Sequence, residues 1–245
     1  MEGYDASTYG DRIAGIYDEL YQELFDVEGT VDHLAELAQG GPALELAIGT
    51  GRIALPLRER GVEVHGVDIS EAMVEKLRAK PGGADIPVTM GDFADVPVYG
   101  EYPLVYLIFN TLFALTNQEE QVKCFANVAE HLAPEGVFVI ECFWPDIARF
   151  DRHQRIGVDR ITRDTVSLET TRHDPVNQRS ESLHLVMKES GIEMYPVVVR
   201  YAYPAELDLM ARLAGLRLRD RFGSWRREPF TSDSHGHVSV YEKPA

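Results

Sequence analysis

The chain has 245 residues, 44% of them hydrophobic, and a formal net charge of −16 at pH 7. This length predicts one domain, or one domain with an inserted segment. No apolar run approaches the ~20 residues that cross a bilayer, and the acidic balance repels nucleic acid. We therefore expect neither a membrane partner nor a nucleic-acid partner. The acidic start of the chain lacks an apolar signal core, which favours the cytoplasm.

The first forty residues are predicted to be helical. Ile13, Ile16, Tyr17 and Leu20 have the spacing of an amphipathic helix, and residues 31–37 repeat it before Gly40-Gly41-Pro42 ends the pattern. This segment precedes the first predicted strand, so the sheet can form without it. We expect residues 1–40 to form a helical lid over the ligand site.

Strands and helices then alternate. Strands are predicted at 43–48, 63–67, 86–90, 103–109 and 136–142, with helices at 51–60, 70–79 and 118–132. Gly61 is placed to end one helix, and Ser70 to begin the next as its N-cap. Nearly continuous apolar strands are typical of a parallel sheet covered on both faces. The fold class is therefore α/β, with helices on both faces of the sheet. Cys124 and Cys142 fit no metal spacing and are expected to be free thiols on a helix and a buried strand.

The pattern changes after Pro145. Residues 155–203 alternate as strands, with a turn at Asp174-Pro-Val-Asn177, and predict three or four inserted antiparallel strands. A helix at 205–214 and strands at 216–222 and 236–242 then return to the sheet. We expect 41–154 and 204–245 to form the ligand-binding domain, with 155–203 as an antiparallel β cap over the substrate site. A small sheet cannot bury its apolar face alone, which favours a homo-oligomer.

The segment Ala43-Leu-Glu-Leu-Ala-Ile-Gly-Thr-Gly-Arg52, followed by Val62-Glu-Val-His-Gly-Val-Asp68, carries the clearest functional signal. A strand, a Gly-rich turn and a helix lead to a second strand that ends in an acid, which is how a Rossmann-type domain holds an adenosyl ligand. The acid accepts hydrogen bonds from the ribose. The turn fits the dinucleotide pattern G-x-G-x-x-G/A, but Glu45-x-Ala47-x-Gly49-x-Gly51 also resembles motif I of class I S-adenosylmethionine (SAM) methyltransferases, with Ala47 in place of the first glycine.

Downstream motifs favour the methyltransferase interpretation over a NAD(P)-dependent oxidoreductase. Gly91-Asp92-Phe93 resembles the family's adenine-binding segment, Asn110 follows the fourth strand, and Leu132-Ala-Pro-Glu-Gly136 resembles its L-x-P-G-G turn. The terminal pair of strands is also unlike most dehydrogenases. The chain thus resembles a Rossmann-like class I methyltransferase, which implies SAM as the methyl donor and S-adenosylhomocysteine as the product.

The N-terminal segment narrows the resemblance. Tyr9-Gly-Asp-Arg-Ile-Ala-Gly-Ile-Tyr17-Asp-Glu-Leu-Tyr21 resembles the helix that closes over SAM in natural-product N-methyltransferases, such as the aminosugar and lincosamide enzymes. The family's inserted antiparallel sheet is also similar. One departure is Ala114, which lies where some aminosugar enzymes carry a histidine proposed as a base.

The resemblance and the motif together imply a set of cofactor-binding residues. Asp68 is assigned to the ribose, Asp92 to the adenine amino group, and Glu45 to the orientation of the Gly-rich loop. The complete set is Tyr9, Tyr17, Glu45, Ala47, Gly49, Gly51, Arg52, Asp68, Ile69, Met73, Gly91, Asp92, Phe93 and Asn110.

The acceptor is expected to be an amine nitrogen of a small secondary metabolite, in antibiotic biosynthesis. No metal-ligand motif appears, so no metal is expected, and an amine needs only a weak base or solvent. Glu141, at the end of the fifth strand, and His235 and His237, at the start of the last strand, are the candidate catalytic residues because they are expected to face the pocket. An O-methyltransferase acting on a phenol or sugar hydroxyl, and a SAM-binding protein without turnover, remain alternatives.

Overall fold

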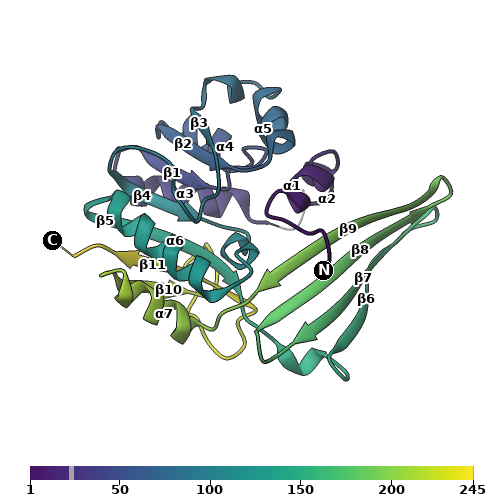
Figure 1. Cartoon of the computed structure of the whole chain (residues 1–245). Coiled ribbons are helices and arrows are strands. Elements are labelled where there is room, and N and C mark those ends of the chain that lie inside the picture. Colours follow the sequence, from purple (N-terminus) through teal and green to yellow (C-terminus); the bar gives the residue numbers. More distant parts are fainter. Residues whose placement is uncertain (22–24, 245) are drawn as a thin grey trace.

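A seven-stranded sheet forms the centre of the computed structural model, which describes residues 1–21 and 25–244 (Figure 1). The strand order is β10-β11-β5-β4-β1-β2-β3. Five strands run parallel, whereas β11 is antiparallel to both β5 and β10. The strands are β1 (Ala43–Leu46), β2 (Val64–Asp68), β3 (Val88–Met90), β4 (Tyr102–Leu107), β5 (Leu132–Phe143), β10 (Arg217–Phe222) and β11 (Gly236–Glu242).

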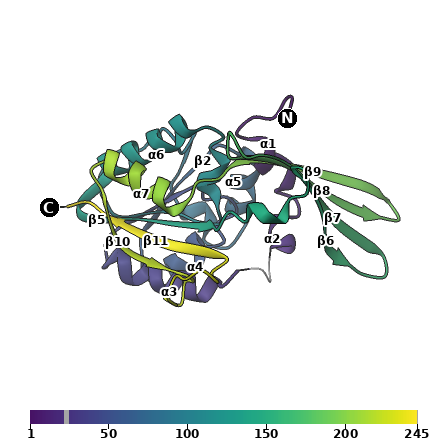
Figure 2. The same cartoon turned by 90° about the horizontal axis from the view of Figure 1, so that it is seen from below.

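Helices cover both faces of this sheet (Figure 2). One face carries α3 (Val27–Ala38) and α4 (Ala54–Glu59), and the other carries α6 (Gln118–His131) and α7 (Pro204–Leu213); α5 (Glu71–Arg78) follows β2. Each layer has its own apolar core, around Leu34 and Leu57 on one side and around Phe125 and Leu207 on the other. This arrangement confirms the predicted α/β class. In the described part of the chain, no helix has the length and apolar character that a membrane span requires.

Local predictions of helix ends and thiols are confirmed. Ser70 accepts a hydrogen bond from the Met73 amide at 3.2 Å as the N-cap of α5, and Gly61 follows α4 with a φ of 86°. Cys124 on α6 and Cys142 on β5 are both buried and free.

The N-terminal segment differs from its prediction, because two short helices, α1 (Thr8–Ile13) and α2 (Tyr17–Leu20), replace one continuous helix. Gly15 lies in the break, where it weakens helix formation. Ile13 and Ala14 are buried against Met73 and two residues of the inserted sheet. Tertiary packing therefore determines the course of this segment.

The insertion between β5 and α7 forms a second, four-stranded antiparallel sheet in the order β6-β7-β8-β9. Its strands are β6 (Gln154–Ile161), β7 (Thr165–Asp174), β8 (Arg179–Lys188) and β9 (Gly191–Arg200). Asp174 forms the predicted turn by accepting the backbone amides of Val176 and Asn177. This sheet projects from the main body beside α1 (Figure 1).

Candidate functional site

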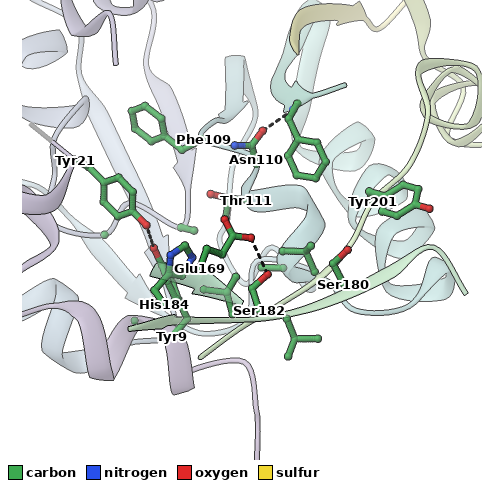
Figure 3. Close-up of a pocket in the computed structure, with 18 of the residues that line it drawn as sticks. Tyr9, Tyr21, Phe109, Asn110, Thr111, Glu169, Ser180, Ser182, His184 and Tyr201 are labelled. Carbon is green, nitrogen blue, oxygen red and sulfur yellow. Dashed lines mark hydrogen bonds between the residues drawn. The ribbon is translucent and has the colours of Figure 1, made fainter. Parts of the chain in front are cut away.

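A cavity of about 430 Å³ lies where the N-terminal helices, the main sheet and the inserted sheet meet. Its floor comes from the carboxyl ends of β1, β2, β4 and β5, which is the edge where open α/β sheets bind ligands. Figure 3 shows the wall opposite, formed by side chains of β7 and β8 together with N-terminal tyrosines. The volume falls in the range typical of small-molecule sites.

The Gly-rich turn and Asp68 form one end of the cavity. Asp68 accepts hydrogen bonds from the Gly49 amide at 2.7 Å and the Ser70 amide at 2.8 Å. Burial raises the pKa of Asp68 although these backbone hydrogen bonds oppose the shift. Ala47 has a φ of 56°, a left-handed conformation that costs a residue with a Cβ about 1–2 kcal/mol. Each carboxylate oxygen can accept a second hydrogen bond, so this end of the cavity fits a ribose.

Nine of the predicted cofactor residues line the cavity. They are Tyr9, Tyr17, Ala47, Gly49, Asp68, Ile69, Met73, Phe93 and Asn110. Asn110 has a φ of 63° and accepts the Phe143 amide at 2.5 Å, so it joins the ends of β4 and β5. The other five predicted residues do not line the cavity.

Glu45 and Gly51 lie beneath the turn. The Glu45 carboxyl group is buried and accepts a hydrogen bond from the Tyr106 hydroxyl at 2.9 Å. Burial raises the pKa of Glu45 to about 8, against hydrogen bonds from Tyr106 and the Ala54 amide. At Gly51, where φ is 74°, a Cβ would lie 2.3 Å from Leu77 Cδ1. Both residues therefore support the turn and its packing on α5.

Arg52 lies behind the aromatic wall of the cavity. Its guanidinium carbon is 4.6 Å from the ring centroid of Tyr17 and 4.9 Å from that of Phe109, with Tyr21 and Phe25 slightly farther away. Such cation–π contacts hold the rings in place. Arg52 thus orders side chains that line the cavity.

The acidic segment after β3 is only partly at the cavity. Phe93 lines it, whereas Asp92 accepts the Ala94 amide at 2.8 Å and closes a local turn. The Gly91 amide donates to the Asp68 carbonyl at 2.8 Å. Gly91 and Asp92 therefore shape the loop that presents Phe93.

The N-terminal helices are attached to the Gly-rich turn by polar contacts. Asp18 accepts the Thr50 hydroxyl at 2.6 Å and forms an ion pair with Lys80 at 2.7 Å. Asp11 accepts the Ser70 hydroxyl at 2.6 Å. These contacts place the Tyr9 hydroxyl 2.9 Å from that of Tyr21 inside the cavity (Figure 3). Tyr21, like Phe25, is a lining residue that the sequence analysis did not assign.

The three predicted catalytic residues do not line the cavity. His237 is 1% exposed, with its ring against Phe230 and its Nδ1 2.9 Å from the Ser239 hydroxyl. His235 is exposed outside the cavity, and its carbonyl accepts the Trp144 amide at 2.7 Å. The sequence identified the correct edge of the sheet, but side chains alternate between faces along a strand, and these histidines do not face the cavity.

Glu141 has a supporting position instead. Its carboxylate accepts the Phe109 amide at 3.0 Å and the Trp225 indole N–H at 2.8 Å. Burial raises the pKa of Glu141, against these two hydrogen bonds. The residue therefore holds the end of β4, from which Phe109 and Asn110 enter the cavity wall.

The inserted sheet supplies polar residues that the sequence analysis missed. We call Glu169, Ser180, Ser182 and His184, which line the cavity from β7 and β8, the acceptor wall (Figure 3). Glu169 accepts the Thr171 hydroxyl at 2.7 Å and the Ser182 hydroxyl at 3.2 Å. Alternation along residues 167–173 and 180–186 was the available signal, because it separates these polar side chains from apolar neighbours.

The Glu169 carboxylate is ionised inside this wall. Burial acts to raise its pKa, but the hydrogen bonds from Thr171 and Ser182 and the charges of His184 and Arg149 outweigh that effect. The pKa of Glu169 therefore lies below its usual value. The lining of the cavity thus combines the acid Asp68 beside the Gly-rich turn with an anionic, hydrogen-bonding wall on the inserted sheet.

A sheet in this strand order, with a Gly-rich turn and an acid at the ligand edge, is typical of enzymes that bind an adenosyl ligand. A family model for the methyltransferase domain matches residues 43–136. The cypemycin N-terminal methyltransferase of a Streptomyces species is 30% identical over 247 residues, covering 98% of this chain and 99% of the relative. The chain belongs to the class I SAM-dependent methyltransferases, and within them resembles the natural-product enzymes.

Two solved structures agree with this assignment. The CcbJ methyltransferase from Streptomyces caelestis is 42% identical with a TM-score of 0.93, covering 99% of this chain and 100% of that one. SAM-bound CalS10, an amino pentose methyltransferase from Micromonospora echinaspora, shares the fold at 21% identity with a TM-score of 0.70, over 93% and 96% of the two chains. The protein is a methyltransferase that uses SAM, and the oxidoreductase alternative is discarded.

Proposed function

We propose that this enzyme transfers the methyl group of SAM to an amine nitrogen of a small natural product. The observation that carries the proposal is the ionised Glu169 that lines the cavity in the acceptor wall, because a half-buried carboxylate favours a cationic partner. Two related proteins support it by their names, since one is an N-terminal methyltransferase of cypemycin and the other an amino pentose methyltransferase.

SAM supplies an electrophilic methyl group on a sulfonium. We assign Asp68 to the ribose hydroxyls, as acceptor, and Phe93 to the face of the adenine, as apolar cover. Tyr9 and Tyr17 close the cavity from the lid, where their rings exclude water and favour a cation. Glu45, Gly51, Arg52 and Asp92 act through the loops and rings that they hold in place.

At the acceptor wall, the Glu169 carboxylate accepts a hydrogen bond from an N–H of the incoming ammonium and thereby fixes the position of the nitrogen. The ammonium must lose a proton before attack, at about 1.4 kcal/mol per pKa unit above ambient. His184 lies on the same wall, with Nδ1 3.7 Å from an Asp159 carboxylate oxygen. We assign solvent to take that proton, with His184 as a polar neighbour of the incoming amine. The remaining catalysis is alignment of the reactants and exclusion of water.

Replacing Asp68 tests its assignment to the binding of SAM. Asp68→Ala removes a charged acceptor, so SAM binding should weaken by about 1.5–3 kcal/mol, which is roughly 10–150-fold in Kd. Titration calorimetry measures this loss. Asp85→Ala is the matched control, because Asp85 is an exposed acid before β3. Unchanged SAM affinity in Asp68→Ala would remove Asp68 from the site.

Replacing Glu169 tests its assignment to the binding of an amine as the methyl acceptor. We expect labelled SAM to methylate amines in a mass-spectrometric screen of small amines, phenols and sugars. With the best amine, Glu169→Gln should raise KM roughly 10-fold or more, because a charged hydrogen bond becomes a neutral one. The Kd for SAM should change less than about twofold. The control Glu193→Gln alters a carboxylate of the same sheet outside the cavity. Turnover confined to hydroxyl acceptors would overturn the proposal.

A further inference from the structure

One side of the cavity is lined by aromatic side chains that the proposed function does not use. Trp144 follows β5, Phe150 precedes β6 and Tyr201 follows β9, and all three line the cavity. Ring contacts through Tyr203 and His173 behind them join the three into one series, in which consecutive ring centroids lie between 4.4 and 5.9 Å apart. We call Trp144, Phe150 and Tyr201 the aromatic rim.

The rings of the rim are held in place from behind. The Tyr201 ring stacks on His173 at an interplanar angle of 30°, and its hydroxyl lies 2.9 Å from His173 Nε2. The Trp144 indole meets the ring of Tyr203 at 70° and that of Phe230 at 56°. Trp144 nevertheless remains 41% exposed. The rim therefore offers a preformed aromatic surface that the rest of the described chain leaves uncovered.

The rim lies next to the acceptor wall. Glu169 and His173 share one face of β7, four residues apart, which is about 13 Å along the strand. Phe150 stacks on that His173 with centroids 4.4 Å apart. Figure 3 shows Tyr201 on the opposite side of Glu169 from the N-terminal tyrosines. The rim thus faces the acceptor rather than SAM, at a distance that one small molecule can bridge.

The lining beside the rim is mostly apolar. Val197 and Val199 line the cavity from β9, and Ile147 lines it while 49% exposed. Ala114 also lines the cavity and ends the 3-10 turn η2 (Thr111–Ala114), which packs against β5 and β9. A methyl side chain there leaves room for a ligand. A polyhydroxylated ring would leave hydroxyl groups without partners against this surface, which opposes its binding.

We propose that the methyl acceptor is an amine that carries an aromatic ring a few bonds from its nitrogen, so that the ring lies on the aromatic rim while the nitrogen lies at Glu169. This inference rests on the proposed function, because it takes the acceptor atom to be a nitrogen. Edge-to-face and offset ring contacts favour an aromatic ring over a saturated ring of similar size. Trp144, as the exposed member of the rim, is then a specificity-determining residue.

The test compares three amines with the intact enzyme and labelled SAM: phenethylamine, its saturated counterpart cyclohexylethylamine, and glucosamine. We expect kcat/KM for phenethylamine to exceed that for cyclohexylethylamine about 2–10-fold, and that for glucosamine roughly tenfold or more. Calorimetry with enzyme saturated by S-adenosylhomocysteine should give the same order of Kd without any methyl transfer. Equal Kd values for the two ring amines would overturn the proposal.

The variant Trp144→Leu keeps an apolar side chain but removes the flat ring. The ratio of kcat/KM between phenethylamine and cyclohexylethylamine should fall to about one, whereas a purely structural role would lower both values alike and keep their ratio. The Kd for SAM should change less than about twofold. The matched control Tyr99→Leu replaces an aromatic residue that is 99% exposed outside the cavity, and it should keep the wild-type ratio.

The outcomes separate this inference from the proposed function. Methylation of amines without preference for the aromatic ring, or a wild-type ratio in Trp144→Leu, would overturn the inference and leave the proposed function standing. Turnover confined to hydroxyl acceptors would overturn the proposed function, and the inference with it.

Discussion

At the scale of single residues, His237 shows how burial removes a histidine from acid–base chemistry. Burial lowers the pKa of His237 to about 4, with the charge of Arg221 acting in the same direction. The ring is neutral at neutral pH and closed off from the cavity. It was a candidate from sequence because it lies at the start of the last strand, and in the structure it pairs with Cys142, next to Phe143, which does line the cavity. The face of a strand, unlike its edge, depends on register and packing that the sequence pattern alone does not determine.

The low pKa of His237 predicts a pH dependence of stability. The unfolded chain binds the proton with a pKa near 6.5, whereas the folded chain binds it only near 4, so stability is lost as pH falls between these values. From about pH 7 to about pH 4.5, this site should cost wild type about 2 kcal/mol in free energy of unfolding. His237→Gln should escape that loss in urea unfolding.

The control is His235→Gln, at an exposed histidine two residues away, which should lose as much stability on acidification as wild type. Both variants should keep methylation rates within a few-fold of wild type. Equal acid sensitivity of wild type and His237→Gln would show that His237 is not buried neutral in solution.

At the scale of elements, the N-terminal helices close the cavity without belonging to the sheet. Deleting residues 1–20 removes Tyr9 and Tyr17 and the contacts of Asp18 with Thr50 and Lys80. SAM affinity should fall roughly tenfold or more, equal to about 1.4 kcal/mol or greater. Circular dichroism should still show a folded domain, because the strands and both cores lie after residue 26.

A milder variant distinguishes the attachment of the N-terminal helices from the contact of their tyrosines with SAM. Asp18→Asn weakens the attachment to Lys80 but keeps both tyrosines, so its loss of affinity should be smaller than that of the deletion. A folded deletion variant with full SAM affinity in calorimetry would rule out the lid.

The sequence predicted the main sheet well because its signals are local. Apolar strands, the Gly-rich turn, the Ser70 cap and Gly61 each depend on a few neighbouring residues, and the order of strands and helices then limits the topology. The antiparallel strands of the insertion were predicted in the same way. The path of residues 8–20 was not, because Ile13 and Ala14 follow contacts made by residues far along the chain.

The residues of the candidate site divide in the same way, into those that local sequence signals predicted and those that depend on tertiary structure. Asp68, Gly49 and Phe93 were predicted because the motif and its resemblance assign them by spacing. Glu169 and His184 were missed because they reach the cavity only when β7 and β8 fold back over the main sheet. The alternation of side chains along each strand indicates that these residues share one face of the inserted sheet. That this face lies against the cavity depends on tertiary structure.

At the scale of the whole molecule, charge and the apolar face oppose each other. Two copies with a net charge of −16 each repel at long range, whereas the exposed side chains of Ile156, Val158 and Ile161 on β6 form an apolar surface through which two copies can meet. The Debye length falls from about 30 Å at about 0.01 M salt to about 3 Å at about 1 M. Salt should therefore screen the repulsion and leave the apolar contact intact, so the dissociation constant of the homo-oligomer expected from the sequence should fall as sodium chloride rises. Sedimentation velocity across this range measures it. The control is the double variant Val158→Lys/Met194→Lys, which places charges on two exposed apolar residues of the inserted sheet and should stay at the lower mass at every salt concentration. Dissociation of wild type by salt would instead indicate an interface built on ion pairs, and would contradict the packing of apolar sheet faces.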